Sequence, residues 1–237
     1  MAGLSLKHGE PVILVHKIDF TMPEKLFQSL CGKISKSKRA RILKFKFRDD
    51  ALRGLFGELL LKYGLEKIYG ITYSDDIFST DNYGKPHLID GQIYFNISHS
   101  GDWSCIIFHK APAGIDVEQI TEPPFEIMPR NFTTREIEQI ENTDRLVKAK
   151  RFYEMWTLKE SYIKMHGKGL SLALDSFSID LGDRKKIKVI DENSEASNIR
   201  FILSYLDSYH VLSVCLNDFD KEISQEHISL TLLTGEN

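Results

Sequence analysis

The segment formed by residues 151–168 constrains the fold of this chain most strongly. No glycine or proline interrupts it before Gly167, and its apolar and aromatic side chains recur at helical spacing: Phe152, Met155, Trp156, Ile163 and Met165. This pattern predicts a buried helix. Glu160 and Lys164 lie four residues apart within it and therefore project from one side. Such a charged pair is either part of a solvated helix face or part of a functional site.

A second segment, GIDVE at residues 114–118, favours the functional interpretation. Its alternation is typical of a strand, with Ile115 and Val117 on one face and Asp116 and Glu118 on the other. Side chains two apart on a strand share a face, so both carboxylates point the same way.

The composition indicates an ordinary globular protein of one large domain or two small ones, with 237 residues, 42% hydrophobic and 27% charged. A net charge of -3 gives no global field for nucleic acid or a membrane surface, so any basic site must be local. No apolar run approaches the roughly 18 residues of a membrane span, and no secretory leader is evident. Cys31, Cys105 and Cys215 are far apart and lack metal-binding spacing, so we expect reduced core thiols in a cytoplasmic protein.

Hydrophobic periodicity and turn residues predict alternating strands and helices. Thr133 followed by Glu136 has the spacing of a capping box and predicts the start of a helix. Residues 218–237 look peripheral. We expect strands at 11–18, 71–74, 93–97, 103–108, 172–180, 200–206 and 209–216, and helices at 27–32, 49–63 and 151–168.

Three segments of the first half offer cations or hydroxyl groups. Residues 33–48 hold eight Lys or Arg and no acid, which predicts a solvated helix face or a phosphate-binding helix with Lys38 and Arg41. Lys85, in the loop 81–87, is an ordinary loop lysine or a phosphate ligand. Ser98 and His99, at the end of a predicted strand, are hydrogen-bonding turn residues or part of an anion site.

The proline-rich, apolar segment at residues 122–129 is expected to be exposed and irregular. It is either a plain connection or a partner-binding surface formed by Phe125, Ile127 and Met128.

The two halves of the sequence echo one another. Glu160 and Lys164 precede Gly167 as Glu58 and Lys62 precede Gly64, and Glu160 follows Glu58 by 102 positions. This echo predicts an α+β fold of two pseudo-symmetric α/β halves, residues 1–111 and 112–237, each a helix packed on a small antiparallel sheet. A ligand would then bind in the cleft between them.

Five ordered motifs resemble one known family. The segments YFNISHSGDW at 94–103, GIDVE at 114–118 and WTLKESYIKMHGKGLSL at 156–172 resemble the signatures of the Sfp-type 4'-phosphopantetheinyl transferases. The upstream segments ISKSKRARILKF and YGKPH are similar to that family's phosphate-contacting regions. The Lys-Glu-Ser form at residues 159–161 resembles the subgroup serving peptide and siderophore synthesis, some members of which also serve fatty-acid carriers.

The resemblance implies an enzyme that transfers the phosphopantetheine arm of coenzyme A to a carrier-protein serine and releases 3',5'-ADP. It also implies Mg²⁺ held by Asp116, Glu118 and Glu160, and a set made only of carboxylates argues against zinc. In this interpretation Lys164 stabilises the departing phosphate, and either Glu160 or a metal-bound water accepts the serine proton. The residues implied for binding coenzyme A are Lys38 and Arg41 with His99 at the 3'-phosphate, and Lys85, Ser98 and Lys159 at the other phosphates or the nucleotide.

The implied partner is an acyl or peptidyl carrier protein, an acidic helical domain that would dock on an apolar patch with a basic fringe. The docking candidates are Phe125, Ile127, Met128 and Arg130. We expect a monomer with no nucleic-acid or membrane partner. Two alternatives stay open: a non-catalytic coenzyme-A-binding protein, which has no need of three carboxylates, and another Mg-dependent phosphotransferase, although no Walker-type glycine loop is present.

Overall fold

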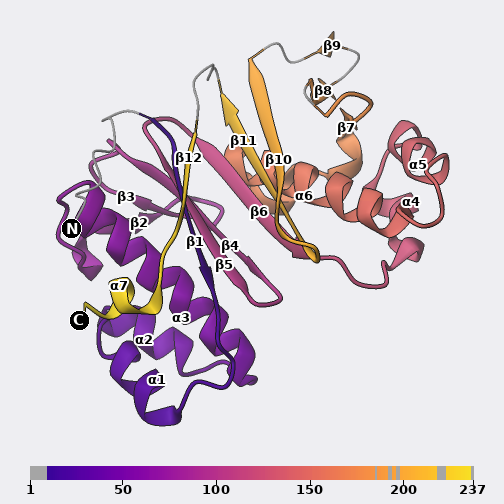
Figure 1. Cartoon of the computed structure of the whole chain (residues 1–237). Coiled ribbons are helices and arrows are strands. Elements are labelled where there is room, and N and C mark those ends of the chain that lie inside the picture. Colours follow the sequence, from indigo (N-terminus) through magenta and orange to yellow (C-terminus); the bar gives the residue numbers. More distant parts are fainter. Residues whose placement is uncertain (1–9, 185, 192–193, 196–197, 218–222, 236–237) are drawn as a thin grey trace. The chain divides into compact units, whose positions relative to one another are not determined.

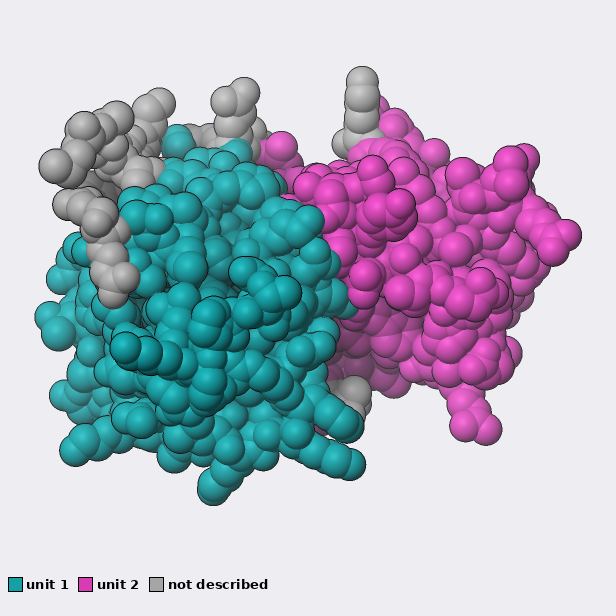
Figure 2. Space-filling view, turned by 60° about the horizontal axis from the view of Figure 1, so that its bottom comes forward, with its two compact units in different colours: residues 1–110, 221–237 teal, residues 111–220 magenta. Residues whose placement is uncertain are grey.

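The computed structural model describes residues 10–184, 186–191, 194–195, 198–217 and 223–235. The chain divides into two compact units, coloured separately in Figure 2: unit 1 is Met1–Lys110 with Lys221–Asn237, and unit 2 is Ala111–Asp220. The expected halves, residues 1–111 and 112–237, differ from these units mainly in residues 221–237, whose described part, residues 223–235, belongs to unit 1.

Unit 1 is built on a four-stranded sheet of order β12-β1-β5-β4, in which β1 pairs antiparallel with β5 and parallel with β12 (Figure 1). The long helix α3 packs against this sheet, and its leucines are completely or almost completely buried. The elements of unit 1 are β1 Val12–Lys17, α1 Glu24–Cys31, α2 Lys36–Ile42, α3 Arg48–Tyr63, β2 Phe78–Thr80, β3 Pro86–Leu88, β4 Tyr94–Ser100, β5 Trp103–His109, β12 Ser224–His227 and α7 Leu230–Thr234.

Unit 2 is built on an antiparallel sheet of order β10-β11-β6, against which helix α6 packs, and it carries a second small sheet of order β7-β8-β9 (Figure 1). The aromatic and apolar face of α6 forms the core of this unit, as its periodicity predicts. The elements are β6 Ala113–Gln119, α4 Met128–Asn131, α5 Thr134–Glu141, α6 Lys148–His166, β7 Phe177–Asp180, β8 Lys188–Asp191, β9 Ser194–Glu195, β10 Ile199–Asp207 and β11 His210–Asn217.

The central elements of both units follow the same order along the chain. A strand (β1 or β6) is followed by a long helix (α3 or α6) and then by a hairpin (β4–β5 or β10–β11) whose second strand pairs antiparallel with the first strand. The α+β class and the plan of a helix on a small sheet in each half are therefore confirmed.

Most predicted elements form within a few residues of their expected bounds. The strand expected at residues 172–180 begins only at Phe177, and there are three further differences. Residues 71–74 are not a strand, although Tyr73 is buried there. The basic segment is helical over Lys36–Ile42 and again from Arg48, where α3 begins, and residues 43–47 between them are exposed. The segment expected to be peripheral forms β12, which pairs with β1 from Val12↔Ser224 to Val15↔His227.

Cys31, Cys105 and Cys215 are buried free thiols, as expected. None of the helices in the described part of the chain is both long enough and apolar enough to cross a membrane.

Candidate active site

The polar site of unit 2 depends on direct contact between α6 and β6. A Cβ atom at Gly114 would lie 1.9 Å from the carbonyl oxygen of Ser161 and 2.6 Å from the amide nitrogen of Met165. Only glycine therefore permits the helix to lie on the strand at this point. The face of β6 that carries Gly114 also carries Asp116 and Glu118, because side chains alternate along a strand.

Asp116, Glu160 and Lys164 form the charged group on this face. Lys164 donates a hydrogen bond from Nζ to Oδ1 of Asp116 at 2.6 Å, and only 3% of Asp116 is exposed. Burial raises the pKa of the Glu160 carboxyl, the nearby Asp116 carboxylate raises it further, and Lys164 opposes both. Two carboxyl groups are thus close enough to interact, and an ammonium group already compensates one of them. Glu118 is half-buried on the same strand.

The donor set at this position suits a hard divalent cation. Carboxylate oxygens are the ligands that Mg²⁺ prefers, and a buried pair of carboxylates gains most from a cation between them. Within the described residues, no group of three or more His, Cys, Asp or Glu side chains is already arranged to hold a metal ion. The predicted meeting of Asp116, Glu118 and Glu160 around one ion therefore stays a prediction.

A cavity of about 220 Å³ in unit 1 brings together several of the predicted coenzyme-binding residues. Lys38 and Arg41 from α2, Lys85 from the β2–β3 turn and His99 from β4 all line it. It is a cation-rich hollow formed by segments that are distant in sequence, which is the chemistry that phosphate groups require.

Glu58 organises two of these cations and was missed as a site residue. Its carboxylate is 2% exposed, and Oε1 accepts from Arg41 Nη2 at 2.7 Å and pairs with Lys38 Nζ at 3.2 Å. Tyr73 donates to Oε2 at 3.3 Å. The sequence echo with Glu160 was the one signal that singled out this glutamate. Ser98, by contrast, is buried in β4 and is not among the residues that line the cavity.

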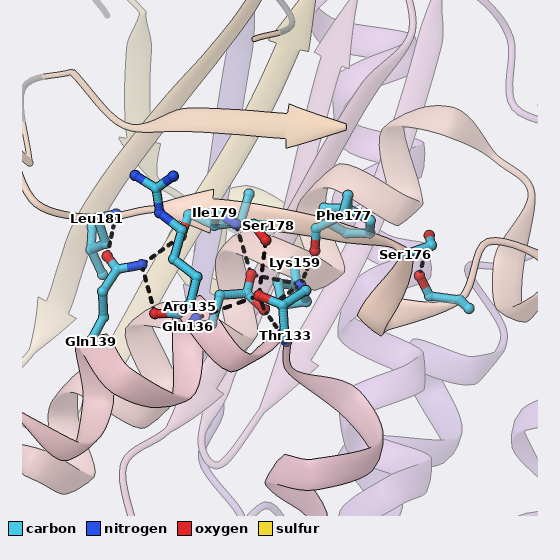
Figure 3. Close-up of polar contacts among 11 residues, drawn as sticks. Thr133, Arg135, Glu136, Gln139, Lys159, Ser176, Phe177, Ser178, Ile179 and Leu181 are labelled. Atoms are coloured by element: carbon cyan, nitrogen blue, oxygen red, sulfur yellow. Dashed lines mark hydrogen bonds and ion pairs between the residues drawn. The ribbon is translucent and has the colours of Figure 1, made fainter. Parts of the chain in front are cut away.

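Lys159 lies elsewhere than predicted. Its side chain is completely buried, and Figure 3 shows it bonded to α5 and β7. Nζ donates to Oε1 and Oε2 of Glu136 at 2.6 and 2.8 Å and to the carbonyl oxygen of Phe177 at 2.7 Å. Burial lowers the pKa of this ammonium, and the Glu136 carboxylate partly offsets that effect. The predicted contact with coenzyme phosphates is at odds with this burial.

The expected exposed docking group is largely part of the core of unit 2. Met128 is 5% exposed, and Phe125 and Ile127 are partly buried against the same cluster. The ring of Phe125 packs edge-on against Phe152 of α6 at 5.6 Å. A short turn followed by α4 folds the segment back onto α6, so its apolar side chains have intramolecular partners. Arg130 is exposed, as expected.

Two family models together match most of the chain. The model described as "4'-phosphopantetheinyl transferase superfamily" matches residues 112–215, and "4'-phosphopantetheinyl transferase, N-terminal" matches residues 21–110. The β6 and α6 carboxylates lie in the first match and the cation-rich cavity in the second. The class of protein is therefore a phosphopantetheinyl transferase.

Individual relatives support the same class over nearly full length. The chain is 36% identical to the 4'-phosphopantetheinyl transferase Sfp of Bacillus subtilis (strain 168), over 81% of this chain and 86% of the relative. It is 31% identical to the 4'-phosphopantetheinyl transferase psf-1 of Bacillus pumilus, over 95% and 94%. A solved holo-(acyl-carrier-protein) synthase from Bacillus anthracis str. Ames is 17% identical with a TM-score of 0.40, over 46% of this chain and 97% of that one, a likeness too distant to show a shared fold by itself.

The chain belongs to the Sfp-type 4'-phosphopantetheinyl transferase family. It is an enzyme of the class that transfers phosphopantetheine from coenzyme A to a carrier protein.

Proposed function

We propose that this chain transfers the 4'-phosphopantetheine arm to a serine hydroxyl of an apo acyl or peptidyl carrier protein in a Mg²⁺-dependent reaction that releases 3',5'-ADP. The observation that carries the proposal is the group formed by Asp116, Glu160 and Lys164, in which two interacting carboxyl groups and an ammonium share the polar face between β6 and α6. This combination can hold a cation and still offer a base.

Asp116, Glu118 and Glu160 would hold the magnesium ion. When bound, Mg²⁺ would neutralise charge on the pyrophosphate of coenzyme A, which makes the phosphorus easier to attack and 3',5'-ADP a better leaving group. The carboxylate ligands support this assignment, and so does the position of Glu160 beside the buried Asp116, because Lys164 compensates only one of these two carboxyl groups.

The unit 1 cavity would bind the nucleotide end of coenzyme A. Lys38, Arg41 and His99 would hold the 3'-phosphate, and Lys85, which also lines the cavity, would bind a second phosphate. Glu58 keeps the two α2 cations in place without a ligand, so the cavity is arranged before the nucleotide arrives.

The chemical step is a displacement at the phosphorus that carries the pantetheine arm. The serine oxygen forms the new phosphorus–oxygen bond, the bond to the bridging oxygen breaks, and 3',5'-ADP leaves. We assign Glu160 as the base that accepts the serine proton, because it is the carboxyl group of α6 that shares this polar face with Asp116 and Lys164. Lys164, one helical turn away, stabilises the negative charge on the leaving phosphate.

Carrier docking is assigned to the segment around Phe125 and Arg130. Arg130 supplies an exposed cation for an acidic partner. Phe125 lines a hollow whose charged residues are Arg145, Lys148, Glu122 and Glu141. Met128 belongs to the core of unit 2 and is not exposed for docking. We also propose a cytoplasmic monomer, since three buried free thiols fit a reducing compartment and one chain carries both strand–helix–hairpin units.

The test is to incubate the chain with coenzyme A, MgCl₂ and an apo carrier, and to measure the carrier by mass spectrometry. We expect the carrier to gain the mass of the arm, and Asp116→Asn to abolish the gain while the protein stays folded. A chain that binds coenzyme A without modifying the carrier would be a non-catalytic binding protein. A gain of phosphate alone would indicate a different phosphotransferase.

A further inference from the structure

The buried ion pair of Glu136 and Lys159 joins three elements of unit 2 (Figure 3). Lys159 comes from α6, Glu136 from the first turn of α5, and the main chain of β7 completes the group. The three ammonium hydrogens have three acceptors: both oxygens of Glu136 and the carbonyl of Phe177. The group is therefore a fully satisfied polar network inside an apolar core.

Both oxygens of the Glu136 carboxylate also accept hydrogen bonds from backbone amides. Oε1 accepts from the amide of Ile179 at 2.7 Å, and Oε2 accepts from the amide of Thr133 at 2.8 Å. The second contact belongs to the capping box that starts α5. The Glu136 carboxylate thus fixes the beginning of α5, links α5 to β7 through the Ile179 amide, and binds the Lys159 ammonium of α6.

Stability alone gives no reason for such a pair in this place. Burying two charges costs about as much as their attraction returns, and apolar residues of similar volume often do as well or better. An ion pair differs from an apolar contact in its dependence on orientation, because its hydrogen bonds are kept only when both groups hold one relative geometry. The pair therefore specifies one orientation of α6, which an apolar contact would specify less sharply.

Helix geometry shows which catalytic groups depend on that orientation. Successive residues of an α-helix are rotated by about 100°, so with Lys159 at 0°, Glu160 lies near 100°, Lys164 near 140° and Ser161 near 200°. Ser161 is fixed on the opposite side, where its carbonyl abuts Gly114 and its hydroxyl is 2.8 Å from that of Ser213. Glu160 and Lys164 therefore lie between two anchored positions.

We propose that Glu136 and Lys159 are positioning residues that set the rotation of α6 about its axis and so hold Glu160 and Lys164 against Asp116. The inference rests on the proposed function of those three residues. A rotation of about 20° would move a side-chain end by about 2 Å at a radius of about 6 Å. Misplacement by about 1 Å can cost roughly a hundredfold in rate.

The test uses the neutral double variant Glu136→Gln/Lys159→Met. The glutamine carbonyl still accepts from the Ile179 amide. Its NH₂ group cannot accept from the Thr133 amide as Oε2 does, but it can donate to the Thr133 hydroxyl, and no buried charge is left alone. We expect a cooperatively folded protein whose kcat is reduced roughly ten- to a hundredfold, with an unchanged KM for the carrier. We also expect weaker binding of Mn²⁺, used as the probe ion with coenzyme A and without carrier, measured by electron paramagnetic resonance.

Arg135→Gln is the matched control. It removes an exposed ion pair with Asp180 that joins the same α5 and β7 but does not reach α6, so kcat and Mn²⁺ binding should stay at wild-type values. A folded double variant with wild-type kcat and Mn²⁺ binding overturns the proposal. A double variant that fails to fold does so as well, because the pair would then serve folding only. Failure of the wild-type chain to load the carrier refutes the proposed function, whereas the Mn²⁺ comparison still decides the positioning role.

Discussion

The two strand–helix–hairpin units differ most on the face where the first strand meets its helix. The two units can be aligned at the first residue of the second hairpin strand. This residue is Trp103 in unit 1, where it pairs with Lys17, and His210 in unit 2, where it pairs with Gln119. In this register Leu14 and His16 of β1 correspond to Asp116 and Glu118 of β6. Unit 1 therefore packs a leucine and a histidine ring under α3, where unit 2 places two carboxylates under α6.

The difference shows where each unit keeps its ionisable groups. In unit 1 the strand side of α3 is apolar, and the buried Glu58 is compensated by Lys38 and Arg41 of α2. In unit 2 the carboxyl groups of Asp116 and Glu160 interact with each other, and both lie near the ammonium of Lys164. The same plan thus places a glutamate between two cations in unit 1 and two interacting carboxyl groups beside Lys164 in unit 2. Only the pair of carboxyl groups in unit 2 is therefore expected to bind a divalent cation.

The largest effect is expected for Glu160→Gln. The amide retains the shape of the side chain but cannot accept the serine proton and is a poorer metal ligand, so kcat should fall by about 10² to 10⁴. Steady-state loading of an apo carrier measures this loss, and circular dichroism checks folding. Activity within tenfold of wild type would remove Glu160 from its assigned role.

The glycines at the two helix–sheet contacts should respond differently to alanine. In Gly114→Ala the new Cβ meets backbone atoms of α6 at 1.9 and 2.6 Å, which can yield only if the helix moves. We expect the free energy of unfolding to fall by about 3 kcal/mol, with most of the activity lost. In Gly57→Ala the new Cβ lies 3.0 Å from the Ile97 side chain, which can shift.

Gly57→Ala is therefore the matched control. Alanine favours a helix over glycine by about 1 kcal/mol, and this gain offsets the small adjustment of Ile97, so stability should stay within about 1 kcal/mol of wild type. Chemical denaturation of both variants measures the contrast. Equal losses would mean that α3 and α6 lie equally close to their sheets.

Glu58→Gln tests whether the two helix glutamates are functionally distinct. The change leaves Lys38 and Arg41 without their carboxylate, so we expect a loss of stability of about 1–3 kcal/mol. The KM for coenzyme A should rise severalfold because the cations lose their fixed positions, while kcat stays within about twofold, since no reacting atom depends on Glu58. A fall in kcat comparable to that of Glu160→Gln would contradict the distinction.

Local patterns were sufficient where a residue's role depends on its near neighbours in sequence. The capping box of Thr133 and Glu136 forms as predicted, and the alternation of residues 114–118 gives β6 its polar face. The helical period of residues 151–168 correctly indicates the apolar face of α6. These features need only the backbone geometry of one element.

The predictions that were wrong concern partners distant in sequence. Lys159 resembles its neighbours Glu160 and Lys164 in polarity, yet its partner Glu136 lies 23 residues away and draws it into the core. Met128 is buried because it joins the apolar cluster formed by α6 and the elements around it. Strand β12 has no apolar alternation and forms because main-chain groups pair with β1. No periodicity within a single segment carries this information.

The smallest expected effect concerns His16, which occupies in β1 the register position of Glu118 in β6. Its ring is buried and stacks on Phe56 at 4.3 Å, and Nδ1 lies 2.7 Å from the carbonyl oxygen of Ile228. Burial lowers the pKa of His16, and the Ile228 carbonyl only partly opposes this. The unfolded chain therefore binds the proton more readily than the folded one, so the stabilising contribution of His16 is complete above its unfolded pKa of about 6.5 and is lost as the pH falls through the folded pKa.

The difference in unfolding free energy between wild type and His16→Asn, measured by urea denaturation from pH 7.5 to 5, should shrink as the pH falls. If this difference in unfolding free energy stayed constant or grew toward low pH, position 16 of unit 1 would tolerate a charge as readily as position 118 does in unit 2.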